Sequence, residues 1–365
     1  MKKLNIKNIL VPIDFSKMSI EAIGAARNLA QRFGATIHLV HVYDSFYPAG
    51  FAPIPAAVPV AVPVLPPTVV AQMKAKHRED LKELATRFGI SLTNCYLRDG
   101  APVFDEICWV AREISADLIV TPTHGRTGLK HVFLGSTAER VVQHSPCPVF
   151  VCRKGASKID RILVPVDFSA CSLQALKEAI VFADRVAAKI VLMHAVDLGL
   201  AFTSDGYGMY DLTTLIDAAK EGAQDQMRSF VRQAKFGGVR FETNIQVGPA
   251  VSEICRISET RDIDLIIIAT HGRTGFEHLL MGSVAEQIVR HAPCAVLVVP
   301  SHPAERSKRI ARVAKRARSI SAGRSQRIPA EPEKFTKRFR KLDKQAFPER
   351  RKTNKFRESH QLVSR

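Results

Sequence analysis

Short apolar runs along the chain alternate with longer segments of helical periodicity. Such runs are typical of parallel strands buried on both faces, and apolar positions three and four residues apart are typical of amphipathic helices. Strands are predicted at residues 8–13, 36–42, 91–96, 118–121, 148–151, 161–166, 189–195, 240–246, 265–269 and 295–299. Helices are predicted at residues 20–33, 69–88, 103–114, 136–143, 173–185, 212–234, 251–260 and 283–291. The alternation predicts an α/β fold in which right-handed crossovers place helices on both faces of a parallel sheet.

The same motifs occur twice in the same order. Residues 9–16, ILVPIDFS, return as ILVPVDFS at residues 162–169, and THGRTG at residues 123–128 returns unchanged at residues 270–275. A repeat of roughly 150 residues is the size of a domain rather than of a solenoid unit. We therefore predict tandem domains at residues 1–153 and 154–300, with a tail at residues 301–365.

Charge separates the tail from the two repeats. Residues 301–365 hold 21 Lys and Arg against 6 Asp and Glu, so this tail accounts for most of the net charge of +18. Its apolar residues are scattered and follow no period, which predicts disorder. The tail could bind nucleic-acid phosphate or an anionic membrane surface, or be a solvated extension without a partner.

Composition argues against several classes of protein. The seven cysteines include no CxxC motif, which argues against a disulfide framework and a zinc knuckle, and we predict no metal site. The Pro-rich stretch at residues 45–68 is either a surface excursion or a contact surface for a partner. Because an interior proline costs a helix ~3 kcal/mol, it is not expected to span a membrane. No signal peptide is visible at the amino end, and we expect a cytoplasmic location.

Candidate binding residues fall at the predicted carboxyl ends of strands, where open α/β sheets bind ligands. An aspartate follows the first strand of each repeat, a glycine follows the fourth, and a Gly-Ser pair begins the next helix. These residues are Asp14, Gly125, Gly135 and Ser136 in the first repeat, and Asp167, Gly272, Gly282 and Ser283 in the second. Exposed N–H groups and the positive end of a helix dipole suit a phosphate.

Structural roles for the same residues remain open. Ser136 with Glu139, and Ser283 with Glu286, have the spacing of a capping box. Each aspartate could cap the helix that follows it. Two more kinds of loop residue have alternative roles. The histidines could contact a phosphate or fix the loop, and the arginines could contact a phosphate or lie in solvent. These residues are His124, His271, Arg126 and Arg273.

The Val-Pro-x-Asp-Phe-Ser starts, the Thr-His-Gly-Arg-Thr-Gly loops, the Gly-Ser helix starts and the Pro-Cys-x-Val endings resemble the universal stress protein family over about residues 5–300. The resemblance implies two doubly wound domains, each with a five-stranded parallel sheet of strand order 3-2-1-4-5. It also implies that the final strands of the two domains pair, so that one chain forms an intramolecular pseudo-dimer. Whether pseudo-dimers pair further into a homodimer stays open.

The nucleotide-binding branch of that family carries Gly-x-x-Gly, nine residues, then Gly-Ser or Gly-Thr, around the ATP phosphates and ribose. The resemblance assigns phosphate and ribose contacts to Gly125, Gly135, Ser136, Gly272, Gly282 and Ser283, and adenine contacts to Asp14, Val42, Asp167 and Ala195. The leading glycine is replaced by Pro122 in the first repeat and Ala269 in the second. Alanine keeps its N–H, whereas proline has none and fixes φ. We predict that the second domain binds ATP more tightly than the first.

The chain has no Walker lysine, no G-x-G-x-x-G, no kinase catalytic loop and no nucleophile elbow. The resemblance allows slow ATP hydrolysis at most. The absence of these catalytic motifs, together with what the resemblance implies, favours a regulatory protein of the stress response, in which bound ATP, with or without Mg²⁺, sets the shape or assembly of the pseudo-dimer. The alternative is a nucleotide-independent interaction protein that acts through its pseudo-dimer surface and basic tail.

Overall fold

The computed structural model describes residues 5–43, 66–100, 102–123, 134–153, 158–197, 212–272, 281–300 and 325–327. The first repeat consists of β1 (Asn8–Ile13), α1 (Lys17–Phe33), β2 (Thr36–Tyr43), α2 (Pro67–Phe88), β3 (Cys95–Asp99), α3 (Val103–Glu113), β4 (Leu118–Pro122), α4 (Ser136–His144) and β5 (Val149–Cys152). The second repeat consists of β6 (Arg161–Pro165), α5 (Ala170–Val186), β7 (Lys189–Val196), α6 (Leu212–Ala234), β8 (Phe241–Val247), α7 (Ala250–Thr260), β9 (Leu265–Ala269), α8 (Ser283–His291) and β10 (Ala295–Val299). The predicted alternation of strands and helices is confirmed.

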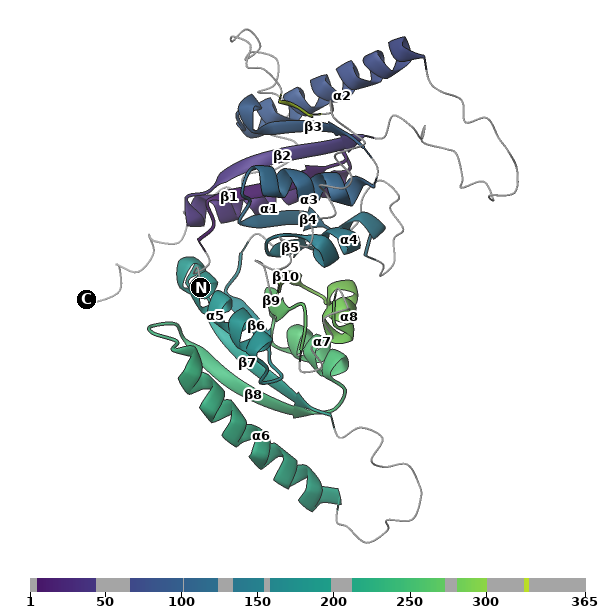
Figure 1. Cartoon of the computed structure of the whole chain (residues 1–365). Helices are drawn as coiled ribbons and strands as arrows, with labels where there is room; N and C mark the ends of the chain where they lie inside the picture. Colours follow the sequence, from purple (N-terminus) through teal and green to yellow (C-terminus); the bar gives the residue numbers. More distant parts are fainter. Residues whose placement is uncertain are drawn as a thin grey trace, which may run out of the picture. The chain divides into compact units, whose positions relative to one another are not determined.

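The ten strands of the two repeats form one continuous mixed sheet (Figure 1). Within each repeat the strands are parallel, and their order is β3-β2-β1-β4-β5 and β8-β7-β6-β9-β10. The last strands, β5 and β10, pair antiparallel and join the two sheets. The order 3-2-1-4-5 and the intramolecular pseudo-dimer are both confirmed. A short strand from the tail, β11 (Ser325–Arg327), pairs antiparallel with β3, and the rest of the tail lies outside the described residues.

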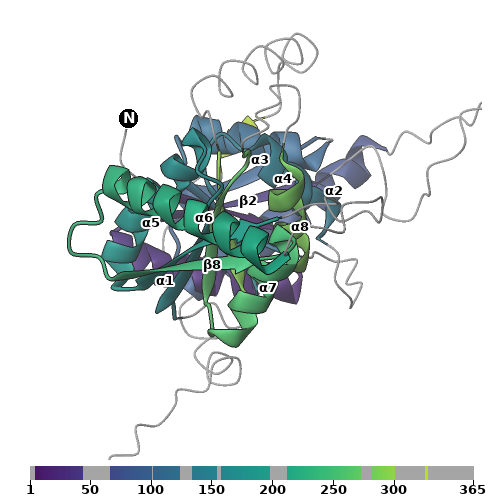
Figure 2. The ribbon, with the colours of Figure 1, turned by 90° about the horizontal axis from the view of Figure 1, so that it is seen from below.

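Helices cover both faces of the sheet because its strands are apolar on both faces. Alternate residues of β1 belong to different buried clusters: Ile9 and Val11 pack on the side of α1, whereas Leu10 packs on the opposite side. The first cluster also takes residues from α2, α5 and α6, and the second takes residues from α3, α4, α7 and α8. Figure 2 shows the second repeat with α6 lying over β8. Strands with two buried faces read as continuous apolar runs, which explains the sequence pattern.

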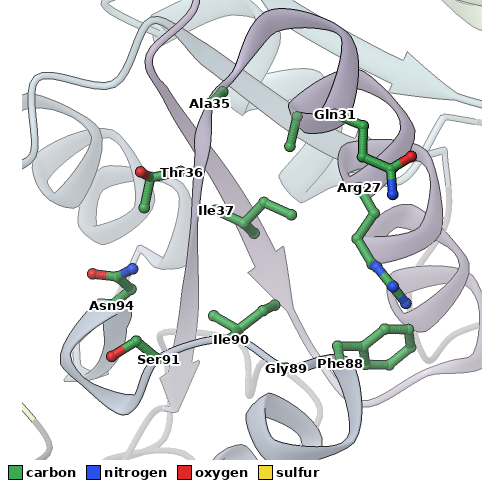
Figure 3. Close-up of a pocket in the computed structure, with 11 residues that line it drawn as sticks. Arg27, Gln31, Ala35, Thr36, Ile37, Phe88, Gly89, Ile90, Ser91 and Asn94 are labelled. Atoms are coloured by element: carbon green, nitrogen blue, oxygen red, sulfur yellow. The ribbon is translucent and has the colours of Figure 1, made fainter.

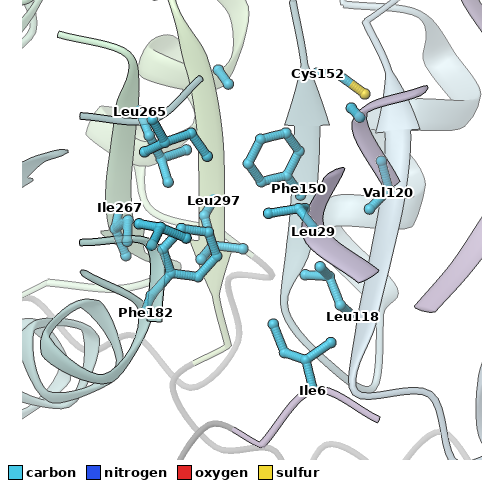
Figure 4. Close-up of a cluster of buried hydrophobic side chains, with 14 of the residues drawn as sticks. Ile6, Leu29, Leu118, Val120, Phe150, Cys152, Phe182, Leu265, Ile267 and Leu297 are labelled. Atoms are coloured by element: carbon cyan, nitrogen blue, oxygen red, sulfur yellow. The ribbon is translucent and has the colours of Figure 1, made fainter. Parts of the chain in front are cut away.

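The seam between the repeats is part of the core. Phe150 of β5 lies opposite Leu297 of β10, and both are fully buried beside Phe182 of α5 (Figure 4). The Phe33 ring of α1 lies 5.3 Å from the Phe182 ring, centroid to centroid. Burial of one such side chain contributes about 1.5–3 kcal/mol, so the seam stabilises the two repeats jointly.

One predicted strand is displaced. Residues 91–96 were expected to form the third strand, but Leu92–Asn94 form a 3₁₀ turn and β3 begins at Cys95. The Asn94 N–H donates to the Ser91 carbonyl at 2.9 Å, and this turn precedes the strand. The strand then continues through Arg98, which is 3% exposed because it pairs with Glu113 and lies over the Trp109 ring.

No helix in the described part of the chain is long and apolar enough to cross a membrane.

Candidate functional site

The predicted site residues lie at the carboxyl edge of each parallel sheet. In the first repeat β1 pairs with β2 on one side and β4 on the other, and in the second repeat β6 lies between β7 and β9. Asp14 and Asp167 follow β1 and β6 directly. Within each repeat, the helix that follows the central strand (α1 or α5) and the helix that follows its neighbour β4 or β9 (α4 or α8) pack on opposite faces of the sheet. This is the arrangement in which doubly wound sheets open a ligand crevice.

Each aspartate holds a tight turn between strand and helix. The Oδ1 atom of Asp14 accepts hydrogen bonds from Ser16 N (3.0 Å) and Ser16 Oγ (2.6 Å), and Ser16 Oγ in turn caps α1 by accepting from Ser19 N. In the second repeat Asp167 holds Ser169 through equivalent bonds, and Ser169 caps α5. The helix caps are therefore the serines, and each aspartate supports its cap through Oδ1.

The residue inside each turn has a left-handed backbone. Phe15 has φ +62° and Phe168 has φ +63°, although positive φ is uncommon for bulky residues. Each phenyl ring lies against a histidine of the neighbouring strand, at 4.5 Å from His41 and 4.3 Å from His194 between ring centroids. These ring contacts and the aspartate bonds together hold the unusual conformation.

Sequence reasoning missed these two histidines. The Nδ1 atoms of His41 and His194 each lie 2.7 Å from the carbonyl oxygen of the residue before the aspartate, Ile13 and Val166 respectively. Because a carbonyl only accepts, the proton of each neutral imidazole lies on Nδ1. The signal was present in the sequence, since the two histidines recur at the same offset of 153 as the two aspartates.

The second repeat brings Asp167 and Gly272 into close approach. A Cβ atom added to Gly272 would lie 2.5 Å from Asp167 Oδ2, which is shorter than any normal contact. The loop after β9 therefore comes this near the aspartate only because residue 272 has no side chain. The corresponding Gly125 of the first repeat lies outside the described residues.

The loops between β4 and α4 and between β9 and α8 are each closed at the neck, the point where their two ends meet, by a backbone hydrogen bond. Gly282 N donates to the Thr270 carbonyl at 2.7 Å, and Gly135 N donates to the Thr123 carbonyl at the same distance. The neck glycines therefore use their N–H groups within the loop. The remaining unpaired N–H donors at the start of α8 and α4 belong to the residues that follow, beginning with Ser283 and Ser136.

The capping boxes expected at these helices do not form. Gly135 and Gly282 are the N-caps, without a side-chain hydrogen bond, so each serine is the first helical residue rather than the cap. The two glutamates instead meet Arg290, whose Nη2 lies 2.7 Å from Glu139 and 3.0 Å from Glu286. The capping explanation for Ser136 and Ser283 is wrong, and both serines are exposed.

The expected adenine contacts occupy equivalent places in the two repeats. Val42 and Ala195 are half-buried near the ends of β2 and β7, and both pack against the cluster under α3, α4, α7 and α8. They follow His41 and His194 directly, so they lie on the opposite face of the sheet from those imidazoles. They flank the edge where the aspartates lie.

The residues that replace the leading glycine end their strands. Pro122 is the last residue of β4 and Ala269 the last residue of β9, and both are buried. Ala269 lies beside Val299 of β10, and the N–H of the next residue, Thr270, donates to the Val299 carbonyl at 3.0 Å. The difference in backbone donors between the repeats, Pro122 against Ala269, therefore falls at the last residue of each strand, directly before the loop.

His271 takes part in the loop itself. Its Nδ1 lies 3.0 Å from Oγ1 of Thr270, the residue that closes the loop neck. His124, Arg126 and Arg273 lie outside the described residues.

A pocket of 410 Å³ lies elsewhere in the first repeat (Figure 3). It is lined by the end of α1, the start of β2 and the residues after α2, including Arg27, Ile37 and Phe88. These segments mark the amino end of β2, opposite to the edge that holds Asp14. The pocket is therefore separate from the candidate nucleotide site.

The described residues contain no group of three or more His, Cys, Asp or Glu side chains able to hold a metal ion. All seven cysteines are free thiols.

Comparisons with known proteins agree with this fold. Universal stress protein MJ0531 of Methanocaldococcus jannaschii is 33% identical over 149 residues, which cover 41% of this chain and 86% of the relative. A putative universal stress protein of Staphylococcus aureus USA300 is 34% identical over 140 residues, which cover 38% of this chain and 82% of the relative.

Two solved structures extend over both repeats. A functionally unknown protein of Pseudomonas aeruginosa PAO1 matches with a TM-score of 0.58 and 18% identity, over 86% of this chain and 98% of its own. A universal stress protein from Archaeoglobus fulgidus matches with a TM-score of 0.53 and 20% identity, over 82% of this chain and 97% of its own. At these identities the likeness shows the fold. The family model of the universal stress protein family matches residues 5–153 and again residues 158–300, and the chain therefore belongs to this family, with two of its domains in tandem.

Proposed function

We propose that this protein is a regulatory adenine-nucleotide-binding protein of the stress response, and that ATP occupies the second repeat more tightly than the first. Asp167 and Ala195 contact the adenine, Gly272 borders the ribose and phosphates, and the start of α8 with Ser283 receives a phosphate. Binding sets the shape or assembly of the pseudo-dimer, and any ATP hydrolysis is slow.

One observation carries the proposal. Gly272 approaches Asp167 so closely that a single methyl group could not be added without displacement of the carboxylate. If position 272 only packed in the core, a small apolar side chain would be accepted there. A loop whose backbone must come close to a ligand instead needs glycine at this position. The exposed Ser283 hydroxyl at the amino end of α8 supports an anion site there, because it has no capping role.

The first experiment is a nucleotide count on full-length protein purified without added nucleotide. The protein is denatured, and released nucleotides are identified and counted by chromatography and mass spectrometry. About one adenine nucleotide per chain supports the proposal, and about two would mean that Pro122 is tolerated. No released nucleotide, together with no binding of added ATP, would contradict the proposal.

The relative ATP affinity of the two repeats is tested with matched variants of the full chain. Asp14→Ala and Asp167→Ala each remove the same two hydrogen bonds to a capping serine, so their effects on the helices are equivalent. Asp167→Ala should remove the tighter ATP site in calorimetric titration, and Asp14→Ala should leave it in place. An equal effect of the two variants would refute the ranking.

Mg²⁺ would accompany the ATP phosphates, and we assign no side chain of the chain as its ligand. Because Mg²⁺ commonly keeps several waters and binds through substrate phosphates, the site needs no dedicated protein cage.

The charge of the tail favours a second candidate, an interaction protein that works without nucleotide. With 21 basic against 6 acidic residues, residues 301–365 could bind nucleic-acid phosphate with counterion release. Truncation after residue 300 should then abolish salt-sensitive retention on a nucleic-acid column. Retention that is unchanged by truncation would eliminate this function for the tail.

A further inference from the structure

We propose that the first repeat holds a transition-metal site made by His41 of β2 and His77 of α2, and that the second repeat has no such site. The ligand class is a divalent ion that prefers imidazole, with Zn²⁺, Ni²⁺ and Cu²⁺ as the candidates. This inference does not depend on nucleotide binding.

The two imidazoles already stand at the separation of metal ligands. His41 Nε2 lies 3.2 Å from His77 Nδ1. Two imidazole nitrogens on one tetrahedral Zn²⁺, each at ~2.0–2.1 Å from the metal, lie about 3.3 Å apart. The separation fits a metal, which could bind both rings once each ring turns so that its lone pair points at the ion rather than at the other imidazole.

The tautomer of His41 is set for binding. Its Nδ1 donates to the Ile13 carbonyl at 2.7 Å, so in the neutral ring the lone pair lies on Nε2, the atom that faces His77. Metal-binding histidines usually donate their other N–H to a carbonyl or carboxylate in this way. Without a metal, His77 donates its Nδ1–H to His41. A bound metal takes the place of that shared proton, and His77 then carries its proton on Nε2.

Aromatic rings restrict both imidazoles. His41 is 4% exposed and His77 is half-buried. The Phe15 ring lies 4.5 Å from His41 and is stacked on His77 at 6.5 Å, and the Tyr43 ring lies 5.3 Å from His77, all between centroids. Rings held by packing lose little freedom when a metal binds, which favours affinity. Water or an external ligand completes the coordination, because the described residues offer no third ligand.

The second repeat provides a natural comparison. His194 makes the same 2.7 Å bond to the carbonyl before its aspartate as His41 does. Along the helices α2 and α6, buried positions recur at an offset of 146: Leu81 with Met227, Leu84 with Phe230, and Phe88 with Ala234. The same offset places Ala223, which is buried, at the position of His77. The second repeat therefore lacks the second imidazole at this point.

A metal here would tie α2 to the turn that carries Asp14. His41 contacts Ile13, the residue before the aspartate, and Phe15, the residue after it. A ligand that draws His41 and His77 together would therefore shift the residues on either side of Asp14, which are Ile13 and Phe15. The first repeat would then respond to a metal and the second would not.

The test uses full-length protein stripped with a chelator and titrated with Zn²⁺, Ni²⁺ and Cu²⁺ by calorimetry. Wild type should show one binding event that His77→Ala weakens at least tenfold, and Cu²⁺ electron paramagnetic resonance should show two coordinated imidazole nitrogens that the variant loses. His291→Ala is the matched control, because His291 is an exposed histidine whose Nδ1 bonds to the Gln287 carbonyl of its own helix. Binding that is equal in wild type and His77→Ala, or absent from wild type, overturns the proposal.

A second variant separates a metal site from a simple hydrogen bond. His77→Gln keeps an amide that can donate to His41 but removes an imidazole ligand. Zn²⁺ should raise the thermal midpoint of wild type and His291→Ala, and leave that of His77→Gln unchanged. A variant His77→Gln that keeps the full metal-induced shift would show that His77 is no ligand.

Discussion

Gly272 shows how much one missing side chain determines at the candidate site. A Cβ atom there would stand 2.5 Å from Asp167 Oδ2. We predict that Gly272→Ala displaces the carboxylate or the loop and weakens ATP binding to the second repeat by tenfold or more, about 1.4 kcal/mol. Calorimetric titration of the full-length variant measures the effect.

Gly222 provides the control for this substitution. It is an exposed residue of α6, and an added Cβ would meet nothing within 4 Å. Gly222→Ala should leave ATP binding unchanged and stabilise the helix by about 1 kcal/mol. If Gly272→Ala also bound ATP like wild type, the close approach to Asp167 would have no part in binding.

The cysteines should differ sharply in reactivity. Burial raises the pKa of the Cys95, Cys147 and Cys152 thiols to about 12, so at pH 8 only about one in 10⁴ is a thiolate. Cys171 of α5 is half-exposed. Brief treatment of native protein with iodoacetamide at pH 8 should therefore modify Cys171 first, as read by peptide mass spectrometry. Preferential labelling of Cys147 would mean that the turn before β5 opens in solution.

At this scale the sequence predicts residues whose role follows from a repeated motif, but not residues whose role follows from a neighbour. Asp167 and Gly272 could be placed at one edge because both follow parallel strands. His41 recurs as His194, yet its contact with His77 joins a strand to a helix across the Pro-rich stretch. No local spacing connects those two histidines, so only the packing of α2 reveals the pair.

The ends of α1 and α5 differ in one residue, and this difference tests how helix termini contribute to stability. The C-cap of α1 is Gly34 with φ +69°, whereas the C-cap of α5 is Ala187 with φ +59°. A left-handed conformation costs an L-residue roughly 1–2 kcal/mol. We predict that Ala187→Gly stabilises the protein by about 1 kcal/mol and that Gly34→Ala destabilises it by about the same amount. Urea denaturation of both variants provides the measurement, and shifts of the same sign would contradict the explanation.

The elements also show where local pattern is an incomplete guide. Most helix and strand limits follow the periodicity, but β3 begins later than its composition suggests. The polar residues Ser91, Thr93 and Asn94 form a turn. The strand instead includes Arg98, a charged residue that a hydropathy pattern would predict to be exposed. Its burial depends on Glu113 and Trp109 from α3, which a local window does not contain. The capping boxes failed for a related reason, since Arg290 of α8 attracts both glutamates.

The two repeats share one core, which the repeated motifs alone did not require. Parallel order within each repeat follows from alternating strands and helices, but pairing of β5 with β10 was expected only from the resemblance to a family. Its physical reason is that each final strand is apolar and would otherwise leave an open edge, a template for aggregation. At this seam Arg290 of the second repeat also bonds to Glu139 of the first. The buried side chains around Phe150 and Leu297 form one cluster across both repeats.

A shared core predicts that the repeats unfold together. Trp109, the single tryptophan, lies on α3 and reports only on the first repeat, whereas Leu297 belongs to the second. Leu297→Ala removes a fully buried side chain and should cost about 2–5 kcal/mol. The urea midpoint from Trp109 fluorescence should fall as far as the midpoint from far-ultraviolet circular dichroism, because a two-state unit gives coincident transitions. Leu215→Ala, at a position on α6 that is 47% exposed, should change stability by no more than about 0.5 kcal/mol. A Trp109 transition that stays in place while the dichroism shifts would show that each repeat folds by itself and that the seam is only a contact.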